Sequence, residues 1–246
     1  MKIITWNIQH GGGKRISSIL KVLELNSGCD VFILTEFRTN GNGHKIQDTL
    51  NSLGFRYSVY QETDSNKNKV FIASKIEFSS NYFPQLMEHE HRIIEVLFKE
   101  TSIGVGKLKI YGCYFPQKDE KKHLFELLIH KIRTTECDVM ILGDLNTGKH
   151  KIDELGETFY QSDYMDDFED FRMTDAFRHL HGDKREFSWF SSYGNGFRID
   201  HIFVSSGLKK HINDCYYTHS HREDKFSDHS MMTLELLDEE RDSTKQ

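Results

Sequence analysis

A carboxylate and an amide follow one of the most apolar runs of this chain, two positions apart. Residues 139–142 (Val-Met-Ile-Leu) lead into Gly143, Asp144, Leu145 and Asn146. The run predicts a buried strand, and Gly143 is expected to let the chain turn where that strand ends. A carboxylate can take a proton from water, and an amide N–H can donate to a phosphate oxygen. The pair therefore suits hydrolysis of a phosphate ester.

Four further segments repeat this pattern of an apolar run with a polar side chain at or near one end. Active sites are commonly assembled from side chains at the ends of several strands. We therefore expect all five segments to meet in one catalytic cluster. The four are residues 3–7, ending in Asn7; 31–36, ending in Glu36; 197–204, containing Asp200; and 226–229, ending in Asp228 and His229.

These motifs resemble the endonuclease/exonuclease/phosphatase superfamily, because they occur in that family's order. They are TWN (5–7), the acid of VFILTE (31–36), GDLN (143–146), RIDHIF (198–203) and SDH (227–229). The stretches YFPQ (114–117), TDAFRH (174–179) and FSWF (187–190) are similar to the exonuclease III-like branch. The resemblance spans residues 3–229. It implies an α/β fold, a four-layer α/β/β/α sandwich with two packed, mostly antiparallel sheets.

The resemblance further implies a metal-dependent phosphodiesterase, with Mg2+ or Mn2+ as its cofactor. Glu36 is the expected metal ligand, because carboxylate oxygens suit these hard cations. Asn7 is expected to lie between the metal and the phosphate and to take part in catalysis. Asp228 is expected to assist on the metal side.

Catalytic roles follow from the same resemblance. Asp144 is expected to activate the attacking water, and Asn146 to orient the phosphate. His229 is expected to contact the phosphate, and a hydrogen bond to Asp200 would favour its protonated form. Tyr114 is expected to reach the phosphate through its hydroxyl group.

The expected substrate is nucleic acid, and in particular DNA, cleaved by an endonuclease or exonuclease activity. Aromatic side chains can stack on a sugar or on an unpaired base, which is the role expected of Trp189 and Phe197. Gln117 and Arg198 complete the expected set of substrate-binding residues.

The chain departs from the exonuclease III-like pattern in ways that bear on substrate choice. The first motif continues as QHGGGK (9–14) instead of an Asn-Gly-Leu-Arg-like stretch, and Thr35 replaces the usual glutamine. His10, in this stretch, is expected to be exposed and not a ligand. Segments 146–175 and 189–198 are short, and in the family they carry loops that grip duplex DNA and an abasic sugar. We therefore expect a nuclease with no strict requirement for an abasic site.

Two alternative functions remain open at this stage. The motifs TWN, GDLN and SDH also fit a phosphatase or a tyrosyl-DNA phosphodiesterase-like hydrolase acting on another phosphate ester. A non-catalytic binding module with the same fold is the alternative from another class. The full set of Asn7, Glu36, Asp144, Asn146, Asp200 and His229 argues against it.

Composition indicates one globular catalytic domain. With 246 residues and 37% hydrophobic residues, the chain can bury a sizeable core; we expect the domain at 1–238 and a polar tail at 239–246. No apolar run of about 18 residues and no leader-like segment is visible, so a cytoplasmic protein without a membrane partner is expected. Four widely spaced cysteines predict thiols in a reducing compartment. The net charge of −6 does not suit a protein that coats long duplex DNA.

The elements that must position these residues are predicted from periodicity. Helices are expected at 15–26, from 44 to Gly54, and at 119–133. Residues 163–170 are expected to form a solvated loop or helix face. Strands are expected at 31–35, 55–60, 70–74, 92–98, 108–114, 198–205, around 212–217, and at 231–237.

Overall fold

The computed structural model describes residues 1–237, in which two six-stranded sheets pack face to face. The expected tail at 239–246 lies outside the described residues. The first sheet has the order β13-β14-β1-β2-β4-β3, with bounds Ile212–Thr218, Met231–Leu236, Lys2–Asn7, Val31–Phe37, Lys69–Ser74 and Tyr57–Tyr60. The second has the order β5-β6-β7-β8-β12-β9, with bounds Ser79–Asn81, Ile93–Phe98, Leu108–Tyr114, Asp138–Asp144, Asp200–Ser205 and Met173–Asp175.

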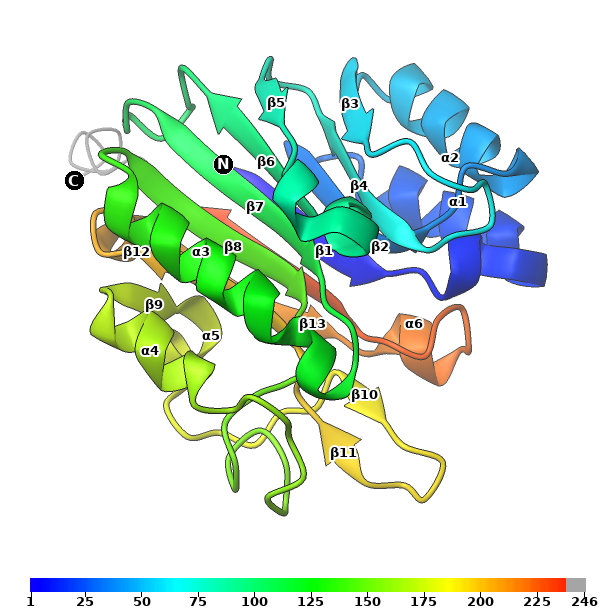
Figure 1. Ribbon diagram of the computed structural model, residues 1–246. Helices are drawn as coiled ribbons and strands as arrows, with labels where there is room; N and C mark the ends of the chain where they lie inside the picture. Colours follow the sequence, from blue (N-terminus) through cyan, green and yellow to red (C-terminus); the bar gives the residue numbers. More distant parts are fainter. Residues whose placement is uncertain (238–246) are drawn as a thin grey trace, which may run out of the picture.

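Each sheet contains one parallel pair, β1 with β2 and β7 with β8, and its other pairs are antiparallel. Helices cover both outer faces, with α1 and α2 on one side and α3 and α4 on the other (Figure 1). The expected four-layer sandwich with mostly antiparallel sheets is thus confirmed. The helices are α1 (Ile16–Leu25), α2 (Gly41–Ser52), α3 (Lys122–Thr134), α4 (Tyr164–Asp170), α5 (Ala176–His181) and α6 (Ser220–Glu223).

The alternation of side chains along the strands produces the layers. In β2, Val31 and Ile33 pack in the core between the sheets, whereas Phe32 and Leu34 pack under α1 and α2. In β8 of the second sheet, Ile141 packs in the core that lies under α3 and α4. Both sheets are therefore buried on both faces, which explains their nearly continuous apolar runs.

Gly143 was expected to let the chain turn where its strand ends, but it lies inside β8. Its φ is +136°, and a Cβ there would lie 2.0 Å from the carbonyl oxygen of Cys113 on the neighbouring strand. Only glycine fits so close an approach. Asp144 and the turn that follows it are thereby brought against the end of β7.

The expected helix at 15–26 is confirmed as α1, and the one at 119–133 as a 3-10 turn, Lys118–Lys121, followed by α3. The acidic segment 163–170 forms a helix, α4, whose Met165 and Phe168 are buried. The expected strand at 198–205 begins only at Asp200. Within residues 1–237, no helix has both the length and the apolar character needed to span a bilayer.

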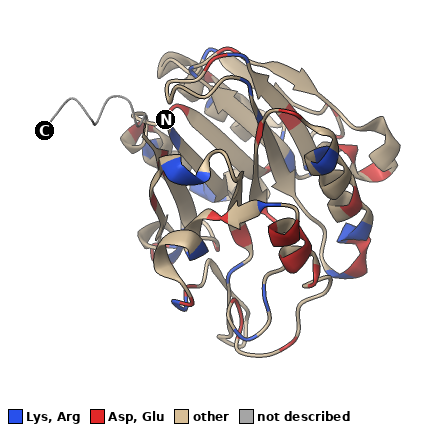
Figure 2. Ribbon diagram, turned by 90° about the vertical axis from the view of Figure 1, so that its left-hand side faces the viewer, with Lys and Arg blue, Asp and Glu red and all other residues tan. Residues whose placement is uncertain are grey.

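Charges are mixed over the side of the molecule that carries α3 and α4. Figure 2 shows lysine and arginine positions interspersed there with aspartate and glutamate instead of forming one basic band. All four cysteines are free thiols, and Cys29, Cys113 and Cys215 are buried, as expected.

Candidate active site

Strand ends from both sheets meet at the end of the sandwich near α6 and the β10–β11 hairpin (Trp189–Phe190 and Gly196–Phe197; Figure 1). Register aligns the site residues: Tyr114, Asp144 and Asp200 stand side by side on β7, β8 and β12. On the facing sheet, Asn7 ends β1 beside Thr35 of β2. The expected convergence of segments distant in sequence is therefore observed.

Asn7 links the carboxylates of the two sheets. Its Nδ2 donates to Oδ2 of Asp144 at 3.0 Å and to Oε1 of Glu36 at 3.3 Å. Its Oδ1 accepts from the backbone N–H of Gln9 at 2.9 Å, which fixes the amide orientation. Asn7 is 1% exposed, so these bonds form in a desolvated place where they are strong.

Glu36 is held in a strained position at the end of β2. Its φ is +57°, in the left-handed region, and the register with β4 shifts between Leu34 and Phe37. Such strain often persists where a side chain must be aimed at a functional site. Tyr114 donates from its hydroxyl to Oε1 of Glu36 at 3.3 Å. Burial raises the pKa of Tyr114 to about 12, so this hydroxyl stays protonated as a donor.

His229 and Asp200 form the expected pair, with 2.7 Å between Nδ1 and Oδ2. Burial by itself would lower the pKa of His229, but the Asp200 carboxylate outweighs it and raises that pKa to about 10. The backbone carbonyl of His229 also accepts from Trp6 Nε1 at 3.2 Å, which fixes the start of β14. A charged imidazole is thus presented to the site, with its Nε2 4.0 Å from Oδ2 of Asp144.

Asp144 is 2% exposed. Burial raises its pKa to about 7, although the neighbouring His229 opposes the shift. Its Oδ1 accepts from the backbone N–H of Asn146 at 3.0 Å. A carboxyl group with a pKa near neutrality is well suited to accept a proton from water.

Asn146 follows in a left-handed turn, with φ of +49°. Its Nδ2 donates to the carbonyl of Phe115 at 2.7 Å, which leaves the second amide hydrogen free to donate elsewhere. Buried Lys121 donates to the carbonyl of Asn146, and burial lowers the pKa of this lysine to about 8.

Two carboxylates that line the cavity, Glu36 and Asp228, fit a divalent cation. Asp228 Oδ2 accepts from Trp189 Nε1 at 3.3 Å, while its Oδ1 is buried without a hydrogen-bond partner. An orphaned carboxylate oxygen at a pocket is a group that a cation would satisfy. With Glu36, whose Oε1 is held by the amide nitrogen of Asn7, the ligand atoms are hard carboxylate oxygens of the kind that Mg2+ and Mn2+ prefer.

A second grouping also converges, because ligand atoms of Asp144, Asp200 and His229 lie within 4.8 Å of one another. However, Nδ1 of His229 is hydrogen-bonded to Asp200, and the raised pKa keeps the ring protonated at both nitrogens. A protonated imidazole has no lone pair for a metal. The Glu36 side is therefore the better candidate.

A cavity of about 570 Å3 opens over these groups. Gln117 lies exposed at its rim and Trp189 on its wall, as expected of substrate-binding residues. Phe197 pairs with Trp189 across the hairpin, with ring centroids 5.7 Å apart, and supports it. Among residues 1–237, the lining of the cavity includes neither Phe197 nor Arg198.

The expectation of a substrate contact at Arg198 is wrong for this structure. Its side chain is 1% exposed, donates to Asp153 from Nε at 2.6 Å, and donates to Asp175 from Nη2 at 2.6 Å. The guanidinium neutralises two buried carboxylates, so it serves the fold. His201 is likewise structural, as expected, since its Nε2 bonds to the carbonyl of Thr147 at 2.8 Å.

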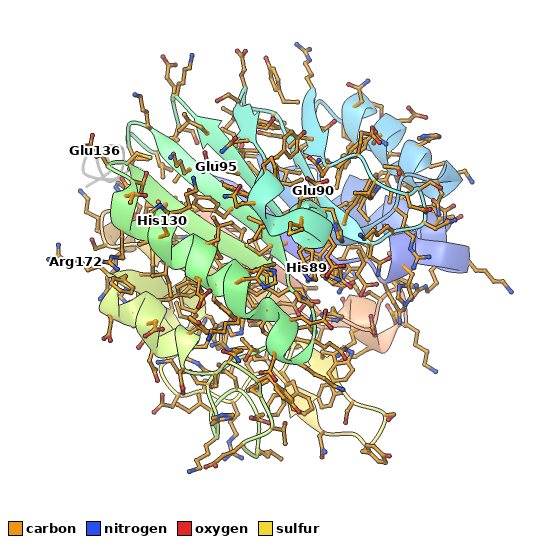
Figure 3. The ribbon with its side chains drawn as sticks, viewed as in Figure 1. His89, Glu90, Glu95, His130, Glu136 and Arg172 are labelled. Carbon is orange, nitrogen blue, oxygen red and sulfur yellow. The ribbon has the colours of Figure 1, made fainter. Side chains whose placement is uncertain are left out.

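Sequence reasoning missed three residues at the cavity: His10, Arg92 and Lys118. His10 is exposed, as expected, and its Nδ1 lies 2.9 Å from Oε2 of Glu36. Arg92 stacks its guanidinium on the Tyr114 ring, 4.8 Å from the centroid. Only Lys118 could have been identified from the sequence as a cavity residue, because it directly follows the YFPQ motif. Other histidines lie elsewhere, such as His89 on the 3-10 helix Pro84–Arg92 and His130 on α3 (Figure 3).

Comparison with known proteins identifies the family and the fold. The model of the Endonuclease/Exonuclease/phosphatase family matches residues 4–229. No significantly similar sequence was found among curated proteins.

Solved structures with the same fold include a 3′ phosphatase, NExo from Neisseria, bound to a product DNA hairpin. It is 22% identical, with a TM-score of 0.77 over 96% of this chain and 99% of that chain. An AP endonuclease from Archaeoglobus fulgidus is 19% identical, with a TM-score of 0.77 over 96% and 99%. An AP endonuclease from Leishmania major is 16% identical, with a TM-score of 0.72 over 96% and 87%.

Proposed function

This chain belongs to the endonuclease/exonuclease/phosphatase family, and from that premise we propose that it hydrolyses phosphodiester bonds of DNA with Mg2+ or Mn2+ as cofactor. The observation that carries the proposal is the amide of Asn7, which joins Asp144 to Glu36 at the floor of the cavity. That link places a candidate base next to a candidate metal ligand. The free thiols support the further inference of a reducing, cytoplasmic setting.

Water activation is the proposed role of Asp144. Its buried carboxylate would take a proton from water as the water oxygen attacks phosphorus. The N–H groups of Asn7 and Asn146 hold the two carboxylate oxygens, one each. The base is thereby oriented before the substrate arrives, which lowers the cost of reaching the reactive geometry.

His229 is proposed to stabilise the negative charge that develops on the phosphate. Its imidazolium, held by Asp200, would donate from Nε2 to a non-bridging oxygen as negative charge develops. The free amide hydrogen of Asn146 is a second donor for the same group. Both donors are fixed by bonds to protein atoms, so little reorganisation is required during the reaction.

Glu36 and Asp228, with Asn7, are the residues proposed to hold the divalent cation. When bound, the cation supplies electrostatic stabilisation of the phosphate charge. The two carboxylates would contribute the negative charge that attracts it. The unpartnered Oδ1 of Asp228 is the strongest structural support for this assignment.

Substrate breadth is proposed from the site's shape and from the short loops. Trp189 can stack on a sugar or base beside the cut. The segment between its hairpin strands is only Ser191–Asn195, which leaves little chain to enclose a lesion. Cleavage of DNA with no strict need for an abasic site is therefore the proposal.

A second activity, removal of a terminal phosphate, uses the same groups. One structure with this fold is named as a 3′ phosphatase and another as a 3′-5′ exonuclease from Neisseria meningitidis. The cavity over Asp144 and His229 can receive a strand end as well as an internal linkage.

The experiment compares five substrates with purified protein and Mg2+ or Mn2+. They are matched duplex, duplex with one abasic site, duplex with a 3′-phosphate, single-stranded DNA and RNA. We expect cleavage of duplex with and without the abasic site. Cleavage confined to the abasic duplex would overturn the proposed breadth, and release of phosphate alone would make the chain a phosphatase.

The metal is tested in parallel. Excess EDTA should abolish cleavage and added Mg2+ or Mn2+ should restore it, whereas full activity in EDTA refutes the cofactor. Glu36→Gln should lose activity, and Glu88→Gln, whose side chain is 82% exposed, should retain it. Inactivity on every substrate by a protein that still binds metal would favour the binding-module alternative.

A further inference from the structure

His10 faces the candidate metal ligand Glu36 across the mouth of the cavity. Its ring nitrogen Nδ1 lies 2.9 Å from Oε2 of Glu36, and its backbone N–H donates to the same oxygen at 2.8 Å. The other oxygen, Oε1, already accepts from Asn7 and Tyr114. Oε2 is therefore the oxygen of Glu36 that faces His10.

The turn that carries His10 is built to hold this position. Gln9 and His10 both have a positive φ, +49° and +55°, which is uncommon for residues other than glycine. Arg15 braces the turn by donating from Nη2 to the carbonyl of Gln9 at 2.8 Å. Gly11 continues it with φ of +67°, where a Cβ would lie 3.1 Å from Cβ of Arg38. Strain retained in this way is typical of functional turns.

Neighbouring groups determine which atom His10 presents to Glu36. Arg38 donates from Nε to Oδ1 of Asn68 at 2.6 Å, which fixes the orientation of that amide. The amide nitrogen Nδ2 of Asn68 consequently points to Nδ1 of His10, at 3.1 Å. An amide N–H can only donate, so this contact favours the His10 tautomer that has its proton on Nε2 and a lone pair on Nδ1.

In that tautomer, Nδ1 of His10 lies 2.9 Å from Oε2 of Glu36, so one cation could be bound by both atoms. Adjacent ligand atoms of an octahedral ion with bonds of about 2.1 Å are about 3 Å apart, which matches this separation. Asn68 can turn its N–H to the hydroxyl of Tyr114, which lies 3.5 Å away. We propose that His10 is a direct ligand of the same divalent cation as Glu36, which gives this site a mixed imidazole–carboxylate ligand set.

The consequence is metal selectivity. Imidazole suits borderline transition ions, whereas an all-oxygen site suits Mg2+. The chain should therefore prefer Mn2+ over Mg2+ more strongly than a site with only Glu36, Asn7 and Asp228 would. This inference rests on the proposed function, because it concerns the same cation.

The experiment measures metal binding in the absence of nucleic acid. Mn2+ and Mg2+ affinities are obtained by calorimetry for the wild type and for His10→Gly, a substitution that keeps the left-handed turn accessible. We expect Mn2+ binding to weaken about tenfold or more and Mg2+ binding to change little. Thermal unfolding of each variant checks that the fold is retained.

Spectroscopy of bound Mn2+ tests directly whether an imidazole nitrogen is a ligand. Electron spin echo envelope modulation of the Mn2+-loaded wild type should contain a nitrogen-14 coupling from imidazole, and His10→Gly should lack it. His44→Ala, an exposed histidine on α2, is the matched control and should retain both coupling and affinity. A coupling that persists in His10→Gly, or unchanged Mn2+ affinity, overturns the proposal.

Glu36→Gln separates this inference from the proposed function. If Glu36→Gln weakens Mn2+ binding and His10→Gly does not, the histidine ligand is wrong and the Glu36 cation site stands. If neither substitution weakens binding, both the ligand assignment and the Glu36 metal site are wrong.

Discussion

Two buried groups at the centre of the site both have raised pKa values, for different reasons. Burial raises the pKa of the Asp144 carboxyl to about 7, because desolvation disfavours its charged form. His229 has a pKa raised to about 10 because Asp200 outweighs the effect of burial. A base and a proton donor can thus coexist at mildly alkaline pH.

Substitution of His229 by alanine should remove the proposed contact to the phosphate. His229→Ala should lower kcat by about a hundredfold or more, because donors to a developing charge contribute on that order. KM should change much less, since the imidazolium acts mainly in the transition state. Steady-state kinetics on a cleavable duplex measure both, with His44→Ala as control. Equal losses in affinity and turnover would contradict this role.

The second residue-scale prediction concerns pH. Activity should rise as pH passes through about 7, where Asp144 becomes ionised, and fall as pH approaches about 10, where His229 loses its proton. Asp200→Asn removes the main cause of the raised pKa, so the alkaline limb should move to lower pH. A pH profile of kcat/KM for both proteins measures this shift. An alkaline limb unchanged in Asp200→Asn would show that another group titrates there.

Elements far from the reacting atoms hold the site in register. Arg198 precedes β12 by two residues and binds Asp153 of the long loop after β8 as well as Asp175 at the end of β9. Arg178 of α5 also contacts Asp153. This buried network ties the loop to the strand that carries Asp200. Arg198, which was expected to touch substrate, therefore helps to position the strand that carries Asp200.

The element-scale prediction is a loss of stability in Arg198→Met. Removing one partner of a buried ion pair typically costs about 3–5 kcal/mol in the free energy of unfolding, because the other charge remains buried and uncompensated. Urea denaturation measures the change. Lys122→Met, which breaks an exposed pair with Glu126, is the control and should change stability little. A similar small effect in Arg198→Met would mean that the network contributes little to folding.

The same network makes the free energy of unfolding depend on pH. Burial alone would raise the pKa of Asp175, but Arg198 holds it well below its usual range. A depressed carboxyl pKa contributes stability above the unfolded-state value of about 4, which is lost as pH falls below it. Wild-type unfolding free energy should therefore fall with acid, and less steeply in Arg198→Met. Parallel acid titrations by circular dichroism test this comparison.

At the scale of the whole molecule, charge limits how DNA can be held. The net charge is −6, and the face in Figure 2 has acids among its bases. Arg92 and Lys118 are the lysine and arginine residues that line the cavity within residues 1–237. Phosphate contacts should therefore be few and concentrated at the site, so that affinity for long duplex is modest.

We expect the binding constant for duplex DNA to depend only weakly on salt concentration. With two phosphate contacts, the logarithm of the binding constant should fall with the logarithm of salt with a slope of about −2. Arg92→Ala and Lys118→Ala should each reduce its magnitude by about 1. Fluorescence anisotropy of the Asp144→Asn variant on duplex DNA, from about 50 to about 200 mM salt, measures it. A much steeper slope would reveal a basic surface outside the cavity.

From the sequence alone, the longer strands and the polar residues at their ends could be predicted, whereas the short strands β5, β9, β10 and β11 could not. Apolar runs such as 31–34 and 139–142 are local signals, and their side chains alternate between two buried layers. The order of the motifs predicted that Asp200 would meet His229, and the 2.7 Å contact confirms it. The short helix α5 was not predicted as a helix, because its six residues carry too little periodicity.

Tertiary structure alone decided the roles of Arg198 and His10. Arg198 is buried because Asp153 and Asp175, distant in sequence, supply two carboxylates to it. His10 reaches Glu36 because a left-handed turn aims it there. Whether a charged or polar side chain is buried, exposed or a ligand depends on the partners that the fold brings to it, and no local pattern of residues encodes those partners.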